Sequence, residues 1–353
     1  MKNVAILIPS LKPGGAEKQA TLLATMLDKR YKVDMYLLYG DGEASGSNLE
    51  MLAQSGVQVH ALAGNMLSKV MHLWRSLREN KVEVLFNYLT SCDVIGAIAG
   101  RLAGVKKIYG GIRNARLERV KMLADKIAHN WIASGTVYNC YSGAEYFTSK
   151  GYKERKNIVI PNCFRQIAAP IIREDAPIKH LVTVGRFVPQ KDYKTLIEMV
   201  AELKSQRQDF VLDIVGYGVE EEQIRTWIQR YDVADHIHIY IRPDNVQDIV
   251  RSADIYISTS LFEGTSNSIM EALNWSLPVV ATNVGDNDRL VVEGKNGLLT
   301  ACGDVAALAL SVAKLLDSVG LRNQYGLQSN KNLQDNYSLE LFEQRYIRLI
   351  EQE

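Results

Sequence analysis

The sequence predicts an α/β protein made of two doubly wound domains with parallel sheets, which face one another across a cleft. Three observations predict this fold. Apolar, strand-like runs alternate with amphipathic, helix-like runs, which indicates βαβ units and parallel sheets. The alternation stops at a polar, proline-bearing stretch, 162–179, and then begins again. The length of 353 residues exceeds what one hydrophobic core usually serves, so two domains are expected.

The first domain is placed at residues 1–168. A buried strand is followed by a glycine-bearing loop, 10–15, and a helix over 16–29, and a polar loop over 40–48 follows the next strand. Ligands of such domains bind at the carboxyl ends of the strands. The strands expected in this half are 4–9, 33–39, 57–62, 84–87, 107–110 and 157–161.

The second domain is placed at residues 169–337, with helices expected over 193–205 and 220–231. The tail, 338–353, carries an amphipathic helix over 338–352, because its apolar residues recur at helical spacing. The strands expected in the second domain are 180–185, 210–216, 236–241, 254–258 and 278–281.

Composition excludes several classes of protein. The hydrophobic content of 47% and the charged content of 23% are typical of globular proteins. The sequence has neither a signal-peptide pattern nor an apolar run long enough to span a membrane, so we expect a cytoplasmic protein. His236 and His238 form one close pair without an evident third ligand, and no metal site is expected. The cysteines, which also lack metal-ligand spacing and are expected to be reduced, are Cys92, Cys140, Cys163 and Cys302.

The small net charge of +1 hides an asymmetry between the two halves. Residues 1–168 contain 23 Lys and Arg against 13 Asp and Glu, a net charge of +10. Residues 169–353 contain 18 against 27, a net charge of −9. The asymmetry predicts that the first half faces an anionic partner or surface.

The stretch 261–282, between two expected buried strands, is the most informative part of the sequence. A short helix should begin near Ser266 or Asn267, because Ser266 is a favourable N-cap residue. Free N–H groups and the positive end of the helix dipole suit a phosphate. Glu263 precedes this helix, and Glu271 lies about 6 Å along it. The stretch therefore predicts a site for a ligand that carries both phosphate and hydroxyl groups.

Two further loops carry groups that suit an anion. Gly14 and Gly15 lie where the first strand turns into the first helix, and glycines there let a ligand approach the backbone closely. Arg186 and Lys191 follow the first strand of the second domain, and two cations there would neutralise a diphosphate. An ordinary tight turn and a solvated loop remain the alternatives for these two loops.

Several motifs occur in the order that is found in glycosyltransferase family 4. The chain resembles these retaining, metal-independent nucleotide-sugar glycosyltransferases, which have two facing Rossmann-like domains (the GT-B architecture). The resemblance covers nearly the whole chain. The motifs that carry it are Gly14-Gly15-Ala16-Glu17, Ile160-Pro161-Asn162, Val184-Gly185-Arg186-Phe187 with Lys191, Glu263 through Glu271, Pro278-Val279-Val280-Ala281-Thr282 and Asn296-Gly297-Leu298-Leu299.

The resemblance implies a role for each matching residue. Arg186 and Lys191 would hold the donor diphosphate and stabilise the leaving nucleotide, whose charge grows in the transition state. Glu263 would contact the sugar hydroxyls, and Glu271 would accept hydrogen bonds from the ribose. The tail would cross back onto the first domain. The other donor-binding residues implied are Gly15 at the diphosphate, Ile241 and Arg242 at the base, and Ser266 and Asn267 at the phosphates and sugar.

The sequence departs from the family pattern in two places. Many members carry a histidine in the first domain near the donor sugar, where this chain reads Gly110-Gly111-Ile112-Arg113-Asn114. Arg113 is the candidate catalytic replacement. The family often shows two glycines and a glutamate where this chain has Gly285-Asp286-Asn287-Asp288-Arg289, and this leaves the donor sugar open.

The resemblance implies transfer of a hexose or N-acetylhexosamine from a nucleotide sugar to a growing, lipid-linked glycan in polysaccharide biosynthesis. A UDP-sugar is the commoner donor in the family, and GDP-mannose is the alternative. No cofactor, metal or nucleic acid is expected. A nucleotide-sugar epimerase and a non-catalytic nucleotide-sugar-binding protein are the competing interpretations. A dehydrogenase is disfavoured, because no G-x-G-x-x-G follows the first strand.

Basic residues gather in two segments of the first domain, and they predict peripheral binding to the anionic inner face of the cell membrane. Each cation near such a surface contributes about 1 kcal/mol. Two solvated helices, each with one face in the core, are the alternative. The basic residues are Lys69, Arg75, Arg78 and Lys81 in the first segment, and Lys106, Lys107, Arg113, Arg116, Arg119, Lys121 and Lys126 in the second.

Overall fold

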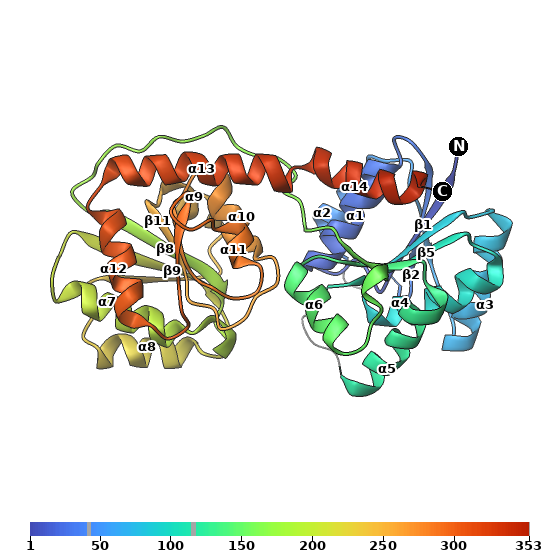
Figure 1. The fold of residues 1–353 in the computed structure, drawn as a ribbon, viewed down its shortest axis with the longest axis horizontal. Coiled ribbons are helices and arrows are strands. Elements are labelled where there is room, and N and C mark those ends of the chain that lie inside the picture. The colour runs from blue at the N-terminus through green and yellow to red at the C-terminus, as the bar shows by residue number, and fades with distance from the viewer. Residues whose placement is uncertain (41–43, 114–117, 353) are drawn as a thin grey trace. The chain divides into compact units, whose positions relative to one another are not determined.

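The computed structural model describes residues 1–40, 44–113 and 118–352, so Asn114 and Arg116 lie outside the described residues. The chain divides into two compact units, Met1–Cys163 with Leu339–Glu353, and Phe164–Ser338. The first boundary thus lies five residues before the expected one, and the second lies one residue after it. Each unit has its own parallel sheet and its own core, as the sequence predicts (Figure 1).

The first unit is built on a seven-stranded parallel sheet in the order β3-β2-β1-β4-β5-β6-β7. Its strands are β1 (Asn3–Ile8), β2 (Lys32–Leu37), β3 (Gln58–Ala61), β4 (Val84–Asn87), β5 (Lys107–Ile112), β6 (Gly135–Tyr138) and β7 (Asn157–Val159). Its helices are α1 (Gly15–Leu27), α2 (Gly46–Ala53), α3 (Met66–Glu79), α4 (Thr90–Ala103), α5 (Arg119–Ile127), the π-helix η1 (Ala128–Ile132), α6 (Tyr141–Ser149), the 3-10 helix η2 (Glu154–Lys156) and α14 (Leu339–Glu351).

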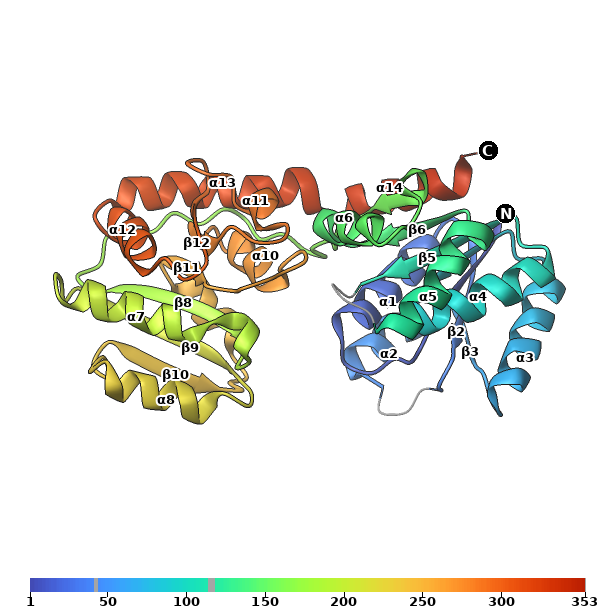
Figure 2. The same cartoon turned by 60° about the horizontal axis from the view of Figure 1, so that its bottom comes forward.

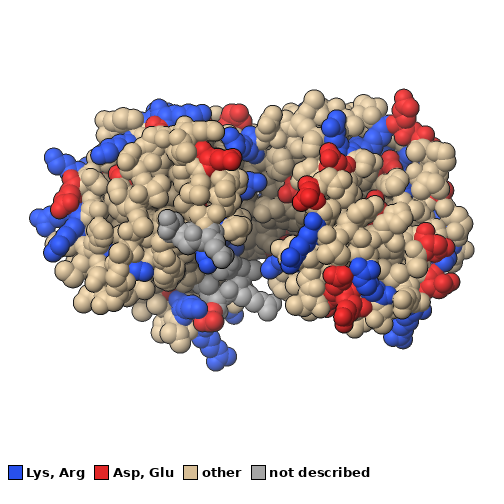
Figure 3. All heavy atoms as spheres, turned by 180° about the vertical axis from the view of Figure 1, so that it is seen from behind, with Lys and Arg blue, Asp and Glu red and all other residues tan. Residues whose placement is uncertain are grey.

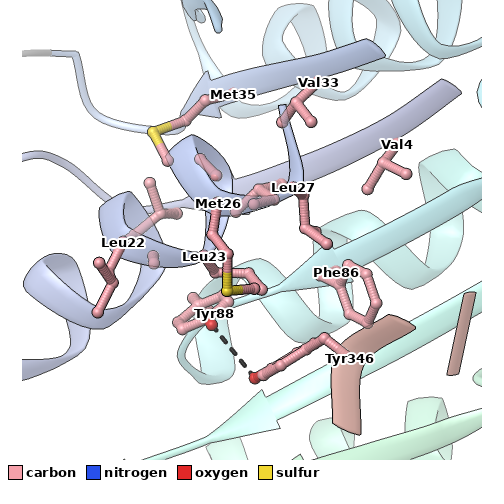
Figure 4. Packing of buried hydrophobic residues seen from close by; sticks show 14 of the residues in the cluster. Val4, Leu22, Leu23, Met26, Leu27, Val33, Met35, Phe86, Tyr88 and Tyr346 are labelled. Atoms are coloured by element: carbon pink, nitrogen blue, oxygen red, sulfur yellow. Dashed lines mark hydrogen bonds between the residues drawn. The ribbon is translucent and has the colours of Figure 1, made fainter. Parts of the chain in front are cut away.

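Both faces of this sheet are covered by helices. α1, α2 and α14 pack on one face, and α3, α4 and η1 contribute to the core on the other. α14 brings Phe342, Tyr346 and Ile350 into the first of these cores. The ring of Tyr346 meets Phe86 of β4 edge-on at 5.2 Å, and its hydroxyl lies 3.3 Å from that of Tyr88 (Figure 4). The tail therefore packs as part of the first unit.

The second unit is built on a six-stranded parallel sheet in the order β10-β9-β8-β11-β12-β13. Its strands are β8 (Lys179–Arg186), β9 (Phe210–Tyr217), β10 (Ile237–Ile241), β11 (Ile255–Ser258), β12 (Val279–Thr282) and β13 (Gly297–Thr300). Its helices are the 3-10 helix η3 (Pro189–Lys191), α7 (Tyr193–Lys204), α8 (Glu221–Arg230), α9 (Val246–Ser252), α10 (Asn267–Asn274), α11 (Asn287–Leu290), α12 (Val305–Leu316) and α13 (Val319–Tyr337).

This second sheet is also covered on both faces. α7, α8 and α12 enclose one core, and α9, α10 and α13 enclose the other (Figure 2). The expected linker runs along this unit. The Phe164 N–H donates to the Tyr337 carbonyl at 2.8 Å, and the Ala168 N–H donates to Asn274 Oδ1 at 2.8 Å. These bonds explain why the unit begins at Phe164, five residues earlier than the sequence predicts.

Candidate functional site

The candidate site lies where the strand order of the second sheet reverses. β8 and β11 are neighbours there, and their connections leave in opposite directions. A doubly wound sheet opens a crevice at this point, outside the carboxyl ends of its strands. Arg186 and Lys191 follow β8, and Glu263 and Ser266 follow β11. The fold therefore gathers the residues that the sequence singled out in two separate loops.

The two loops are held together by hydrogen bonds. The Leu261 N–H donates to the Gln190 carbonyl at 2.8 Å, and Gln190 Nε2 donates to the Phe262 carbonyl at 2.7 Å. The Thr259 hydroxyl donates to the carbonyls of Lys191 and Asp192, at 2.8 and 3.0 Å. The groups carried by these loops are therefore positioned before any ligand binds.

Lys191 and Glu263 form an ion pair inside the site. Lys191 Nζ lies 2.6 Å from Glu263 Oε1, and the Ser260 hydroxyl donates to the same oxygen at 2.8 Å. The two side chains are only 18% and 10% exposed, so the pair is partly shielded from water. Within the described parts of the chain, Glu263 Oε2 receives no hydrogen bond. That oxygen is available to accept a bond from a ligand hydroxyl.

Arg186 differs from Lys191 in having no ion pair. It is exposed at the last position of β8, and no hydrogen bond or ion pair joins its side chain to another described residue. In the register of the sheet it pairs with Tyr217 at the end of β9. The guanidinium is therefore available to bind an anion, whereas the charge of Lys191 is already met by Glu263.

The helix that the sequence predicts after Glu263 is present as α10. Ser266 is its N-cap, and the Ser266 hydroxyl accepts a bond from the Ile269 N–H at 3.5 Å. Ser266 is buried, whereas Asn267 at the first helical position is exposed. The positive end of the helix dipole therefore adds partial positive charge at the loop that follows β11.

Glu271 lies in the second turn of α10 and is half-buried. The buried Tyr256 shows that Glu271 and Glu263 share one neighbourhood. The Tyr256 hydroxyl donates to the Val184 carbonyl at 3.2 Å. Burial raises the pKa of Tyr256, and the negative charges of Glu271 and Glu263 raise it further. The two carboxylates, which are eight residues apart in the sequence, thus both lie close enough to this tyrosine to affect its pKa.

Ile241 and Arg242 lie at the end of β10, the edge strand of the same sheet. The guanidinium of Arg242 stacks over the ring of Tyr217 at 4.2 Å, and Ile241 is 39% exposed. Tyr217 was not predicted as a site residue. Its only indication in the sequence is its position between Gly216 and Gly218 at the end of an expected strand. Tyr217 and Arg242 thus form an exposed stacked pair at the ends of β9 and β10, and Tyr217 pairs with Arg186 in the register of the sheet.

The loop at Gly285, which departs from the family pattern, packs against Glu263. Gly285 has φ +56°, in the left-handed region that favours glycine, and a Cβ at this position would lie 2.1 Å from the Glu263 carbonyl oxygen. The absence of a side chain is therefore required for the loop to reach the backbone of the site. The loop supports Glu263 from one side even though its sequence differs from that of the family.

Two candidate residues lie in the first unit. Gly15 begins α1 directly after the loop that follows β1, and it is exposed. Arg113 is bound within its own unit, because its terminal nitrogens donate to Asn162 Oδ1 at 3.1 Å and to the Tyr346 hydroxyl at 3.0 Å. Its guanidinium also lies 4.8 Å from the ring centre of Tyr88. These contacts tie α14 to the sheet, and a catalytic role for Arg113 stays a prediction.

The side chains of His236 and His238 lie in different environments. His236 precedes β10, where its buried ring bonds to the Phe210 carbonyl and to Gln208. His238 is exposed and lies 3.1 Å from Asp213. Residues 1–40, 44–113 and 118–352 contain no group of three or more His, Cys, Asp or Glu side chains that could hold a metal ion. Within the same ranges, no helix is long and apolar enough to cross a membrane.

Comparisons with known proteins agree with this arrangement. Residues 166–332 match the family model of glycosyl transferases group 1. The chain is 26% identical over 176 residues to the lipopolysaccharide core biosynthesis glycosyltransferase LpsE of Rhizobium meliloti (strain 1021), and the match spans only half the length of each protein. It is 23% identical over 273 residues to the Escherichia coli UDP-Gal:alpha-D-GlcNAc-diphosphoundecaprenol alpha-1,3-galactosyltransferase, covering 71% of this chain and 70% of that protein.

Solved structures share the fold over the whole chain. The crystal structure of Anabaena Alr3699/HepE in complex with UDP matches with a TM-score of 0.83 at 19% identity and covers 99% of both chains. The apo form of the lipopolysaccharide outer core galactosyltransferase WaaB matches with a TM-score of 0.81 at 16% identity and again covers 99% of both. At these identities the likeness shows the fold, which confirms the expected architecture of two Rossmann-like domains.

Proposed function

Because residues 166–332 match the family model of glycosyl transferases group 1, we propose that the chain is a glycosyltransferase. It transfers a hexose or N-acetylhexosamine from a nucleoside-diphosphate sugar to a lipid-linked glycan in polysaccharide biosynthesis. The observation that carries this proposal is the arrangement at the switch point of the second sheet. Arg186 and Lys191 lie there at the end of β8, and Glu263 and Glu271 both lie near Tyr256.

The donor diphosphate is placed against the cations. Arg186 contributes a guanidinium that is unpaired among the described residues, and the N-terminus of α10 contributes the positive end of the helix dipole. Lys191 is drawn away from Glu263 in part when a phosphate approaches, because a doubly charged anion competes with the carboxylate for its three donors. This arrangement stabilises the charge that collects on the diphosphate as the sugar leaves, more than it stabilises the bound donor.

The reaction breaks the bond between the anomeric carbon and the diphosphate oxygen, and it forms a bond from the acceptor hydroxyl oxygen to that carbon on the same face. The configuration is therefore retained, and the acceptor proton passes to the departing diphosphate. Glu263 positions the sugar, because Oε1 is held by Lys191 and Ser260 while Oε2 accepts a bond from a sugar hydroxyl. Glu271 accepts bonds from the ribose.

The nucleobase is placed against the stacked pair of Tyr217 and Arg242, close to Ile241 at the end of β10. A flat aromatic and aliphatic surface with an adjacent guanidinium suits a heterocyclic ring. We propose UDP as the nucleotide, because the Escherichia coli relative is named as a UDP-Gal enzyme and the Anabaena structure is a complex with UDP.

The assignment predicts a selective thermal shift. A UDP-sugar or UDP at a concentration 100-fold above its Kd should stabilise the protein by about 2.7 kcal/mol, whereas GDP-mannose should give no shift. Differential scanning fluorimetry with UDP, GDP and ADP sugars measures it, with Glu271→Gln as the variant expected to reduce the UDP response. A larger shift with GDP-mannose would replace UDP by GDP in the proposal.

Transfer is expected to need no divalent metal, since the charge of the leaving diphosphate is met by Arg186, Lys191 and a helix N-terminus. Transfer of labelled sugar to a lipid-linked acceptor should proceed at the same rate in excess EDTA as in its absence. A matched reaction in EDTA plus excess magnesium controls for effects of the chelator. A strict requirement for magnesium or manganese would contradict this part of the proposal.

The same transfer assay separates an enzyme from the two competing functions. An epimerase would change the sugar while it is still attached to the nucleotide, and a binding protein would leave both donor and acceptor unchanged. Product formation on the acceptor, with release of free nucleoside diphosphate, supports the transferase. Binding of the donor without either product would favour the non-catalytic alternative.

The acceptor is placed on the first unit, at an anionic membrane surface. Groups of Lys and Arg side chains stand around the rim of this unit on the face drawn in Figure 3, where the unit lies on the left. The basic residues of α3 lie on the outer side of a helix whose Leu73 and Leu77 pack in the core. The described basic residues of the second segment do not share this arrangement. We propose peripheral membrane binding through these cations, which high salt should weaken.

A further inference from the structure

Helix α5 and the π-helix η1 that continues it turn four of their apolar side chains toward solvent. Val120, Leu123 and Ile127 are 82%, 58% and 50% exposed, and Trp131 is 77% exposed. Their spacing of three, four and four residues places them on one side of the helix. We call these four residues the α5 stripe.

The inward side of the same segment combines polar side chains with apolar ones such as Ala128, which is 4% exposed. Asp125 and His129 are 3% and 2% exposed, although both can carry charge. The Tyr152 hydroxyl donates to Asp125 Oδ2 at 2.8 Å, and His129 bonds to the Thr136 hydroxyl at 2.8 Å. A surface helix normally buries its apolar side and exposes its polar side. In this segment the pattern is reversed in part, and the polar contacts hold the helix with the α5 stripe toward solvent.

Cations surround the α5 stripe. Arg119 is exposed in the first turn of α5, and Lys121 follows it, paired with Glu118. Lys153 Nζ lies 4.2 Å from the ring centre of Trp131. α4, which contacts both α5 and η1, adds exposed Leu102 next to Arg101. An apolar stripe edged by basic side chains, with a tryptophan, is typical of helices that lie in a membrane interface.

From this reversed polarity we infer that the α5 stripe inserts among the lipids of an anionic bilayer, with Trp131 at headgroup level. The inference rests on the proposed membrane binding and adds an apolar contact to the electrostatic one. A second copy of the chain fits less well. A two-fold interface would place the stripe of one copy against the stripe of the other. The cations around the two stripes, among them Arg119 and Lys121, would then lie near one another and repel.

The experiment uses the full chain and vesicles of phosphatidylcholine with phosphatidylglycerol. Sedimentation is measured at low salt and at 1 M salt for the wild type and for the double variant Val120→Gln with Leu123→Gln. Both residues are mostly exposed, so the change should leave the fold intact. The matched control is Leu310→Gln on α12, which replaces an apolar residue that is 72% exposed and lies in the other unit. Transfer to a water-soluble acceptor checks that each variant is folded.

We expect the wild type and the control to keep part of their binding at 1 M salt. The double variant should lose that part, with affinity lower by about tenfold or more, since two apolar side chains no longer leave water. Brominated lipids should quench the fluorescence of Trp131 in the wild type. Because the chain has four tryptophans, the difference from Trp131→Phe isolates this signal.

Other outcomes overturn the inference at different levels. No binding to anionic vesicles at low salt would remove the proposed membrane association itself. A second outcome is that the wild type and both variants bind equally at low salt, without binding at 1 M salt and without quenching of Trp131. This result would support electrostatic membrane association and overturn insertion of the stripe. If the double variant instead changes the molecular mass in solution but not vesicle binding, the stripe is an interface between copies of the chain.

Discussion

Replacing Arg186 with alanine is expected to lower kcat about 100-fold, with a smaller change in KM. Arg186 is exposed and unpaired among the described residues, so its removal should not disturb the fold. Its charge matters most when the diphosphate departs, because negative charge grows there in the transition state. Steady-state kinetics with varied donor concentration measure the effect.

Two comparison variants make this result specific. Arg230→Ala removes an exposed arginine from the last turn of α8, on the same unit, and should leave kcat unchanged. Lys191→Ala should lower both kcat and the thermal stability, because it leaves the 10%-exposed Glu263 without its cation. Turnover of Arg186→Ala within a few-fold of the wild type would show that Arg186 does not meet the leaving group.

Much of the fold and of the donor site could be predicted because their signals are local. Continuous apolar runs mark the buried parallel strands, and most of these begin and end within two residues of the expected positions. Ser266 could be recognised as an N-cap from its place before an apolar helical pattern, and the structure confirms it. β6 and β13 were missed because each has only four residues and begins with glycine.

The features that could not be predicted depend on contacts between distant residues. Tyr217 lies beside Arg186 only through the register of β9 with β8. The bonds from Arg113 to Asn162 and Tyr346 join three segments that are far apart in sequence. The apolar spacing of α5 predicts a side packed on the core, but the structure buries Asp125 instead. Helical periodicity gives the side of a helix and not the direction in which that side points.

Asp125 has a further consequence, which is a dependence of stability on pH. Asp93 and Asp125 are both buried, and the Gly111 N–H donates to Asp93 Oδ1 at 2.7 Å. Burial raises the pKa of Asp125 to about 6. Burial and the charge of Asp125 also raise the pKa of Asp93 well above its usual value. The pair therefore holds a proton in the folded chain at a pH where the unfolded chain has released it.

The sign of the effect follows from proton binding. An unfolded aspartate has a pKa of about 3.9, so between about pH 4 and pH 6 the folded chain binds the extra proton. The contribution of Asp125 to the free energy of unfolding therefore falls as pH rises through this window, by about 3 kcal/mol for a pKa shift of about two units. His129 affects the free energy of unfolding in the opposite direction. Burial lowers its pKa to about 4 in the folded chain, so the unfolded chain binds a proton first and stability falls as pH falls.

Asp125→Asn is expected to remove the loss caused by Asp125 while leaving that of His129. At pH 7 the free energy of opening of the first unit should be higher in the variant than in the wild type. This difference between the two proteins should be about 3 kcal/mol larger at pH 7 than at pH 4. Hydrogen exchange of β5 and β6, read by mass spectrometry at matched pH, measures this unit alone, because two units need not unfold together. Asp209→Asn, in the other unit, is the control and should leave this exchange unchanged. A variant that is less stable than the wild type by the same amount at every pH would show that Asp125 is ionised in the folded chain and that its carboxylate is stabilising.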